Sequence, residues 1–104
     1  MSAQAPTRSR DLTTRVELVK AVADPTRLRV LDVLGTEGPQ CHCELEVALD
    51  VPASRLSFHL RVLREAGLVG TRRRGRLVAY HLEPRGLAEV HDALPAVDEE
   101  VSAK

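Results

Sequence analysis

Residues 53–66 carry hydrophobic positions at the spacing of an amphipathic helix. Leu56, Leu60 and Leu63 stand at i, i+4 and i+7, so they form one apolar stripe that should face a core. Gly67 can adopt a positive φ and should end this helix. The other positions are mostly polar or basic, which leaves one face of the helix for solvent or a ligand.

A shorter helical run over residues 44–49 precedes this helix, and a proline-containing turn at residues 50–52 separates the two. Two short helices joined by a tight turn form the helix-turn-helix pattern, whose second helix reads the major groove of DNA. The candidate DNA-binding residues of this reading helix are Ser54, Arg55, Ser57, Phe58, His59 and Arg61. The place of His59 beside Leu60 also suits a hydrogen bond to a neighbouring helix.

Two further helices are predicted nearer the N-terminus, over residues 11–23 and 25–34, because apolar side chains recur there at helical spacing. Asp24 can cap the second of these helices, and Pro25 suits its first position. Gly35 and Gly38 should end it, and Pro39 should prevent its resumption. The apolar stripes comprise Leu12, Val16, Val19 and Ala23, widened by Leu18 and Val22, in the first helix and, directed inward, Leu28, Leu31 and Leu34 in the second.

A β-hairpin is predicted after the reading helix, with strands over residues 68–71 and 76–82 and a turn over 72–75. An arginine-rich hairpin directly after a helix-turn-helix is typical of a wing. The wing arginines expected at flanking phosphates or the minor groove are Arg72, Arg73, Arg74 and Arg76. A final helix should run from Pro84 to about Leu94.

The predicted fold is therefore mainly α with a small β-hairpin wing, a winged helix-turn-helix. We expect this domain to span residues 11–95, between a disordered arm over residues 1–10 and an acidic tail over residues 96–104. A chain of 104 residues buries only roughly 65% of its unfolded surface. The first and last helices have wider apolar stripes than such a chain can bury alone, which predicts a homodimer through these two helices.

Charge is distributed unevenly, although the net charge is zero. Residues 55–76 hold seven arginines against the single acid Glu65, a local net of +6 that suits phosphate binding. The two aromatic residues are too few for stacking single-stranded bases, so double-stranded DNA is the expected partner. We expect no enzyme, because paired carboxylates, a nucleophile–base pair and a glycine-rich phosphate loop are not apparent.

The chain is expected to be cytoplasmic, without a membrane partner. It has no apolar run approaching about 18 residues, and its N-terminus lacks the apolar region of a signal peptide. Its two cysteines should then be thiols in a reducing compartment, available for metal or redox chemistry.

Three segments, VADPTRLRVLDVL, LSFHLRVLREAGLV and RRRGRLVAYHL, closely resemble the ArsR/SmtB family of winged-helix transcriptional repressors. The resemblance covers about residues 12–94. It implies a homodimer that binds operator DNA and is released when an inducer, often a metal ion, binds.

The reading helix departs from that family in two places. The family often begins this helix with Ser-Gln-Ser, where this chain has Pro52, Ala53 and Ser54, so base contacts must come from other residues. Phe58 stands where the family often has a second histidine. Phe58 could meet a thymine methyl group or could fill a gap between helix and wing, and the sequence leaves both open.

Cys41, His42 and Cys43 stand where a thiolate sensor of this family has its Cys-x-Cys motif, and Glu46 occupies the position of a third cysteine. The resemblance thus implies an inducer site. Soft thiolates suit thiophilic ions. The candidate ions are Zn, Ni, Cd, Pb and As(III), with Zn or Ni favoured over As(III) when only two sulfurs are present. The candidate metal ligands are Cys41, Cys43, Glu46 and His42.

The family's other metal site joins the last helices of two protomers. The matching positions here are Pro84, Gly86, Val97 and Glu100, of which three cannot ligate, so this site is not expected. We expect His91 to be a buried or interface histidine.

The predicted function is a DNA-binding transcriptional repressor that releases its operator on binding a metal or metalloid ion. One alternative is a metal-independent regulator, either constitutive or responsive to oxidation, although a Cys41–Cys43 disulfide would close a small, strained ring. The other is a protein-interaction winged helix that does not bind DNA. The two cysteines could also simply pack the start of a helix.

Overall fold

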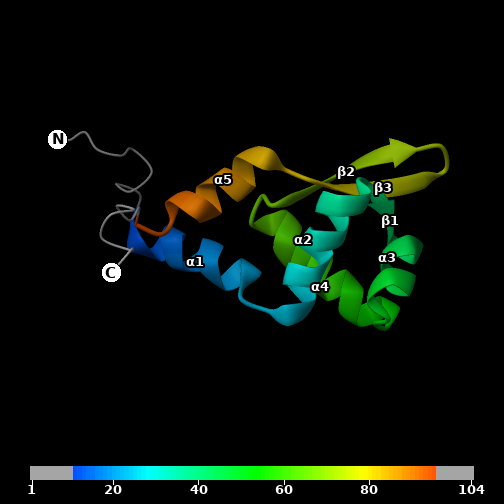
Figure 1. Cartoon of the computed structure of the whole chain (residues 1–104), viewed down its shortest axis with the longest axis horizontal. Helices are drawn as coiled ribbons and strands as arrows, with labels where there is room; N and C mark the ends of the chain where they lie inside the picture. Colours follow the sequence, from blue (N-terminus) through cyan, green and yellow to red (C-terminus); the bar gives the residue numbers. More distant parts are fainter. Residues whose placement is uncertain (1–10, 96–104) are drawn as a thin grey trace.

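Within residues 11–95, the part of the chain that the computed structural model describes, the fold has five helices and a small three-stranded sheet, whose hairpin β2–β3 projects from one side of the helices (Figure 1). In chain order the elements are α1 (Leu12–Val22), α2 (Pro25–Glu37), β1 (Gln40–Cys41), α3 (His42–Leu49), α4 (Ala53–Glu65), β2 (Val69–Arg74), β3 (Leu77–Leu82) and α5 (Pro84–Asp92). The predicted N-terminal arm and acidic tail lie outside the described residues. None of the helices described is long and apolar enough to span a membrane.

Aspartates cap the first two helices, and the cap predicted at Asp24 is confirmed. Asp11 accepts a hydrogen bond from the Thr14 backbone N–H at 2.8 Å, and Asp24 accepts one from the Arg27 N–H at 3.1 Å. Each carboxylate satisfies a backbone donor that the first helical turn leaves without a partner.

The prediction that α2 ends near Leu34, at Gly35 and Gly38, is partly wrong. The helix continues through Gly35 to Glu37, and Gly38, with a φ of 80°, ends it. A glycine lowers helix propensity without preventing a helix, whereas the positive φ at position 38 requires a residue such as glycine. The predicted inward stripe is also partly wrong, because Leu28 is 50% exposed and Val30 is fully buried in its place.

The sheet has one strand more than the predicted hairpin. Its order is β1-β3-β2, and β1 pairs antiparallel with β3 through Gln40↔Tyr80 and Cys41↔Ala79. The predicted turn over 72–75 is also wrong: strand β2 runs to Arg74, and the turn is at Gly75 and Arg76. A run of arginines resembles a loop in sequence, but strand pairing uses the backbone and leaves long side chains free to reach solvent.

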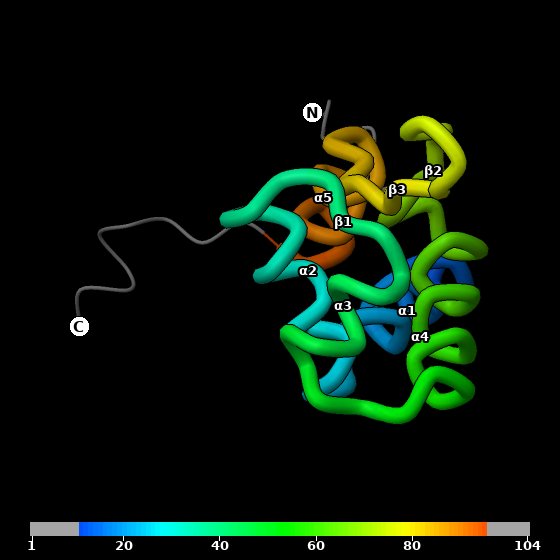
Figure 2. Tube along the Cα trace, turned by 90° about the vertical axis from the view of Figure 1, so that its right-hand side faces the viewer, coloured from blue at the N-terminus to red at the C-terminus, as the bar shows by residue number. Residues whose placement is uncertain are grey.

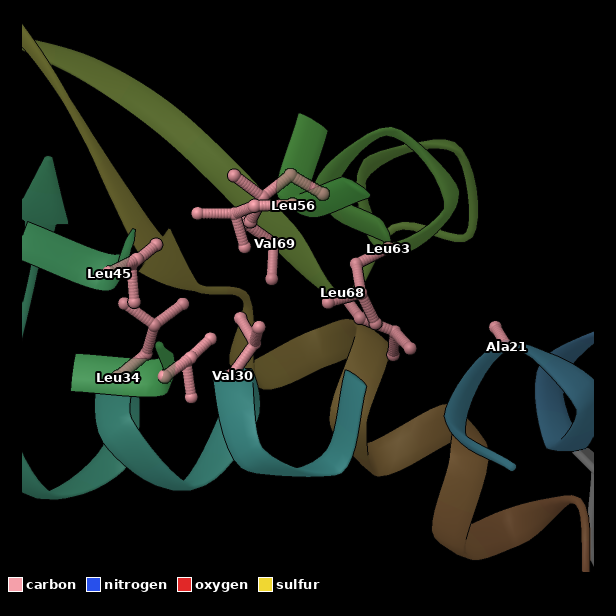
Figure 3. Close-up of a cluster of buried hydrophobic side chains, with 10 residues drawn as sticks. Ala21, Val30, Leu34, Leu45, Leu56, Leu63, Leu68 and Val69 are labelled. Atoms are coloured by element: carbon pink, nitrogen blue, oxygen red, sulfur yellow. The ribbon is translucent and has the colours of Figure 1, made fainter. Parts of the chain in front are cut away.

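The predicted stripe of α4 is confirmed. Leu56, Leu60 and Leu63 are 0–2% exposed and join one hydrophobic core. Figure 3 shows this core gathering side chains from several elements. The other buried members of the cluster are Ala21, Val30, Leu34, Leu45, Leu49, Leu68 and Val69. Figure 2 shows α3 and α4 joined by their turn, with α4 along one side of the molecule. The core therefore holds one face of α4 and leaves the opposite face outward.

The stripe of α1 is less buried than the pattern suggested. Leu18 and Ala21 are its buried positions, while Leu12 is 68% and Val16 49% exposed. Helices α1 and α5 lie side by side at one end of the molecule (Figure 1). His91, on α5, is exposed in the single chain, so the prediction that it is buried fails there and its place at an interface stays a prediction.

Candidate functional site

The outward face of α4 presents the polar and basic side chains predicted for it. Ser54, Arg55, Ser57, Phe58 and Arg61 are all exposed. Half of the Phe58 surface is open to solvent, and the Arg61 guanidinium carbon lies 5.9 Å from the centre of its ring. Such cation–π contact keeps both side chains on the outer face. Phe58 is therefore not a buried gap filler.

His59 was predicted among the DNA-binding residues of the reading helix, but it does not lie on the outward face of α4. It is 8% exposed, and its Nδ1 atom lies 3.0 Å from Nη1 of Arg27 and 3.8 Å from Oδ2 of Asp24. Arg27 in turn donates to the carbonyl oxygen of Ala21 at 2.7 Å. His59 thus ties α4 to the α1–α2 connection, which is the alternative that its sequence position offered, and it does not face DNA. Position 59 is i+3 from Leu56, and this spacing already placed it within the apolar stripe.

The Asp24 carboxylate belongs to the same group and is partly exposed. Partial burial raises the pKa of Asp24, but the hydrogen bond from the Arg27 backbone and the charges of His59 and Arg27 outweigh it. The net effect holds the pKa of Asp24 below its ordinary value. The capping carboxylate is therefore stabilised in its charged form.

The two cysteines meet at the start of α3. Cys41 is buried and Cys43 is exposed, and their sulfur atoms lie 2.8 Å apart as free thiols. The hydrogen bond with Cys41 raises the pKa of the Cys43 thiol. The backbone N–H of Cys41 donates to Oε1 of Glu44 at 2.8 Å, which caps the helix. The structure therefore brings two of the four predicted metal ligands together.

The other two predicted ligands pair with each other. Nδ1 of His42 lies 2.6 Å from Oε2 of Glu46, and Nε2 of His42 lies 3.0 Å from Oγ of Ser57 on α4. Glu46 stands four residues after His42, so the two side chains meet one helical turn apart. Within residues 11–95, no three His, Cys, Asp or Glu side chains gather into a group that could hold a metal ion. The four predicted ligands are thus not assembled as one site.

Arg74 has a partner that its sequence position did not predict. Its Nη2 atom lies 2.9 Å from Oε1 of Glu44, and its Nη1 donates to the Pro39 carbonyl oxygen at 3.2 Å. The hydrogen bond from Cys41 and then that from Arg74 lower the pKa of Glu44. Arg74 therefore ties the end of β2 to the start of α3, while its side chain stays exposed, and its contact with a phosphate or the minor groove stays a prediction.

The remaining wing arginines, Arg72, Arg73 and Arg76, are exposed. They are charged side chains on the strand and turn that extend past α4 (Figure 1). Together with the outer face of α4 they make a basic surface, which suits an anionic partner.

The start of α5 has no room for the family's second metal site. Gly86 is buried, and a Cβ atom there would overlap the carbonyl oxygen of Gly67. A metal-ligating side chain cannot be accommodated at position 86 without moving the helix. The matching positions 97 and 100 lie outside the described residues.

Comparison with known proteins identifies relatives of the chain. A profile of the arsR family of bacterial regulatory proteins matches residues 24–71. Arsenic resistance transcriptional regulator ArsR1 of Pseudomonas putida is 41% identical over 75 residues, which are 72% of this chain and 59% of that protein. The chain thus spans less than two thirds of that relative's length.

Two solved structures are similar as well. The crystal structure of a possible transcriptional regulator for arsenical resistance has a TM-score of 0.69 and 35% identity, and the match covers 85% of this chain and 96% of that one. The homodimeric winged helix-turn-helix DNA-binding domain of a possible ArsR-family regulator from Mycobacterium bovis has a TM-score of 0.68 and 27% identity, covering 86% and 82% of the two chains. On these sequence and structural matches, the chain belongs to the arsR family of bacterial transcriptional regulators.

Proposed function

We propose that this chain is a homodimeric transcriptional repressor that releases operator DNA when a metal or metalloid ion binds. The observation that carries the proposal is the two-sided α4 helix. Its leucines are buried, and its serines and arginines are exposed beside the wing arginines. A helix held firmly from behind can enter a major groove without losing its own packing.

The contacts to DNA divide between bases and backbone. Arg55 and Arg61 of α4 are placed to reach base edges, where an arginine pairs in bidentate fashion with O6 and N7 of guanine. Arg72, Arg73 and Arg76 of the wing suit phosphates, whose recognition is independent of sequence. The base contacts would set specificity, and the wing would set affinity.

The dimer would form through α1 and α5. Leu12, Val16 and Leu94 are exposed apolar side chains on or next to these two adjacent helices. The relative from Mycobacterium bovis is a homodimer. A two-fold dimer would present two reading helices to two half-sites.

The inducer would bind the Cys41–Cys43 pair. The two sulfurs lie close enough to share one thiophilic ion, and the relative from Pseudomonas putida is named for arsenic resistance. Further ligands would come from elsewhere, such as solvent, a residue outside 11–95 or the second protomer. Thiolates must lose their protons to bind, so the response should weaken as pH falls, the more so because the pKa of Cys43 is raised.

The test of DNA binding begins with duplexes that the wild-type chain selects from a random-sequence library. Arg61→Ala should cost about 1–3 kcal/mol on the selected duplex and much less on a scrambled one. Arg73→Ala should weaken both duplexes alike and reduce the salt slope by about one unit. Arg29→Ala, at an exposed position on α2, is the matched control. Binding without salt dependence would favour the protein-interaction alternative.

The test of the inducer adds Zn(II), Ni(II), Cd(II), Pb(II) or As(III) to the protein–DNA complex under anaerobic conditions. One of these ions should weaken binding of the wild-type chain by about 1–3 kcal/mol. Cys43→Ser, at an exposed position, and Cys41→Ser/Cys43→Ser should remove this response and leave binding without the ion intact. Release by oxidant but by none of the ions would favour the metal-independent alternative.

A further inference from the structure

His42 lies next to the cysteine pair and also contacts the outward face of α4. It stands between Cys41 and Cys43 in the sequence, and its ring reaches across from α3 to Ser57 on the outward face of α4. Fifteen residues separate His42 from Ser57. The contact therefore depends on how the two helices are placed.

The chemistry of the ring gives this contact a direction. An ionised carboxylate only accepts hydrogen bonds, so the Nδ1 atom that faces Glu46 at 2.6 Å carries the proton. In the neutral ring Nε2 is then the acceptor, and the Ser57 hydroxyl donates its proton to Nε2 over 3.0 Å. Glu46 thus decides which way the Ser57 hydroxyl points.

Ser57 held in this way has lone pairs to offer and no free proton. In the major groove such an acceptor matches an amino group, N4 of cytosine or N6 of adenine. It does not match a phosphate, which also only accepts. A serine without His42 would present both a donor and an acceptor and would discriminate less.

We propose that His42 is a positioning residue that makes Ser57 a reader of a base amino group and that links Ser57 to the cysteine pair. This inference rests on the proposed DNA-binding function. An ion that binds the Cys41 and Cys43 sulfurs would act on the two residues that flank His42 in the chain, and we infer that it displaces the imidazole between them. The ring then loses its alignment with Ser57, so the effect of the inducer reaches a DNA-contacting atom through a single hydrogen bond.

The first test is a double-mutant cycle on the selected duplex and its single-base variants. Ser57→Ala should cost about fivefold to tenfold in affinity, the usual range for one hydrogen bond, and should abolish a preference for cytosine or adenine at one position of each half-site. His42→Ala should abolish the same preference at the same position, and the double variant should lose no more than either single one. A role confined to folding α3 would not move the base preference.

Matched variants separate positioning from folding. His42→Gln, whose amide oxygen can accept from Ser57, should restore part of the preference. Glu46→Ala removes the acceptor that orients the His42 ring and should weaken the preference, although His42 and Ser57 both remain. Ser54→Ala, at another exposed position on the same face, should add fully to His42→Ala. Additive losses for His42→Ala and Ser57→Ala, or losses at different base positions, would overturn the proposal while wild-type DNA binding stands. If the wild-type chain selected no duplex, the proposed function and this inference would both fail.

The second test measures base preference with the ion that releases the wild-type chain. At partial saturation that ion should reduce the Ser57-dependent preference in the wild-type chain, and it should change nothing further in His42→Ala. An ion that releases DNA while the preference stays intact would overturn the link to the cysteine pair.

Discussion

The half of the molecule built from α2, α3, α4 and the base of the wing buries larger apolar side chains than the α1–α5 pair does. The first half holds the largest fully buried side chains, Leu45, Leu49, Leu56, Leu60, Leu63, Leu68 and Val30. The α1–α5 pair buries Leu18, Ala21 and Ala93, and it leaves Leu12 at 68% and Leu94, just beyond α5, at 57% exposed. Arg15 of α1 reaches the Ala93 carbonyl oxygen at 3.1 Å.

The contrast concerns where the core lies. Most of the leucines of the first half pack into one core within one chain, and this core holds α4 from behind. The α1–α5 pair leaves apolar surface that another surface would have to cover, which fits the dimer proposed for it. If so, association and DNA reading depend on separate sets of residues and can be broken separately.

The largest expected effect concerns the core of the half built from α2, α3, α4 and the base of the wing. Leu63→Ala should lower the free energy of unfolding by about 2–5 kcal/mol, because the lost methyl groups leave a cavity in a packed core. Val47, on α3, is 84% exposed, and Val47→Ala should change the free energy of unfolding by less than about 0.5 kcal/mol. Urea denaturation followed by circular dichroism measures both. Equal effects would mean that this half is not packed as described.

The next effect concerns the contact between the start of α5 and Gly67, where the two halves meet. Gly86→Ala should lower the free energy of unfolding by about 1–3 kcal/mol, because the added methyl group would overlap the Gly67 carbonyl and push α5 away. Gly35→Ala is the matched control: its methyl group would lie 3.6 Å from Cδ1 of Leu82, an ordinary contact. In the interior of α2 it should stabilise by about 0.5–1 kcal/mol. Thermal unfolding should separate the two variants in opposite directions.

A smaller effect is expected at the cap that joins α1 to α2. Asp24→Ala should lower the free energy of unfolding by about 0.5–2 kcal/mol through loss of the N-cap. Because the pKa of Asp24 is lowered by folding, its charged form contributes stability above the unfolded pKa. That contribution is lost as pH falls through the lower, folded pKa.

Asp24→Asn separates the cap from the charge, since asparagine caps a helix without titrating. Its free energy of unfolding should fall less steeply below about pH 4 than that of the wild-type chain. Unfolding curves measured from neutral pH down to acid compare the two. Parallel pH profiles would contradict the role of the charge.

The smallest effect on folding, and the largest on association, is expected at the exposed end of α1. Leu12→Glu/Val16→Glu should leave the helical content unchanged, because surface changes usually alter stability by less than about 0.5 kcal/mol per site. It should also convert a dimer into a monomer in sedimentation equilibrium. A variant that remains dimeric would place the interface elsewhere.

Several features of the molecule could be predicted from the sequence. The leucines of α4, the cap Asp24 and the hairpin after Gly67 follow from periodicity and turn chemistry. His59 was within reach of the same reasoning, since positions 56, 59, 60 and 63 share one helical face. Its polar side chain suggested an outward role, but Arg27 and Asp24 give it partners inside.

Other features depended on elements that meet only in the folded chain. The third strand, Gln40–Cys41, is too short for a periodic pattern and exists because β3 offers a free edge. The Glu44–Arg74 ion pair joins residues thirty positions apart. The burial of Gly86 against Gly67 likewise depends on how α5 returns to the end of α4.

The sequence alone therefore determined the five helices and the hairpin, the face that α4 turns to the core and the basic character of the reading helix. These properties follow from the geometry of one helix or strand and from the hydrophobic effect, both of which act along a short stretch of chain. Only the tertiary structure decided how the four candidate metal ligands divide, with the cysteines together and His42 turned to Glu46 and Ser57. The physical reason is that a hydrogen bond has a reach of about 3 Å, so its partners depend on the placement of whole elements rather than on any local pattern.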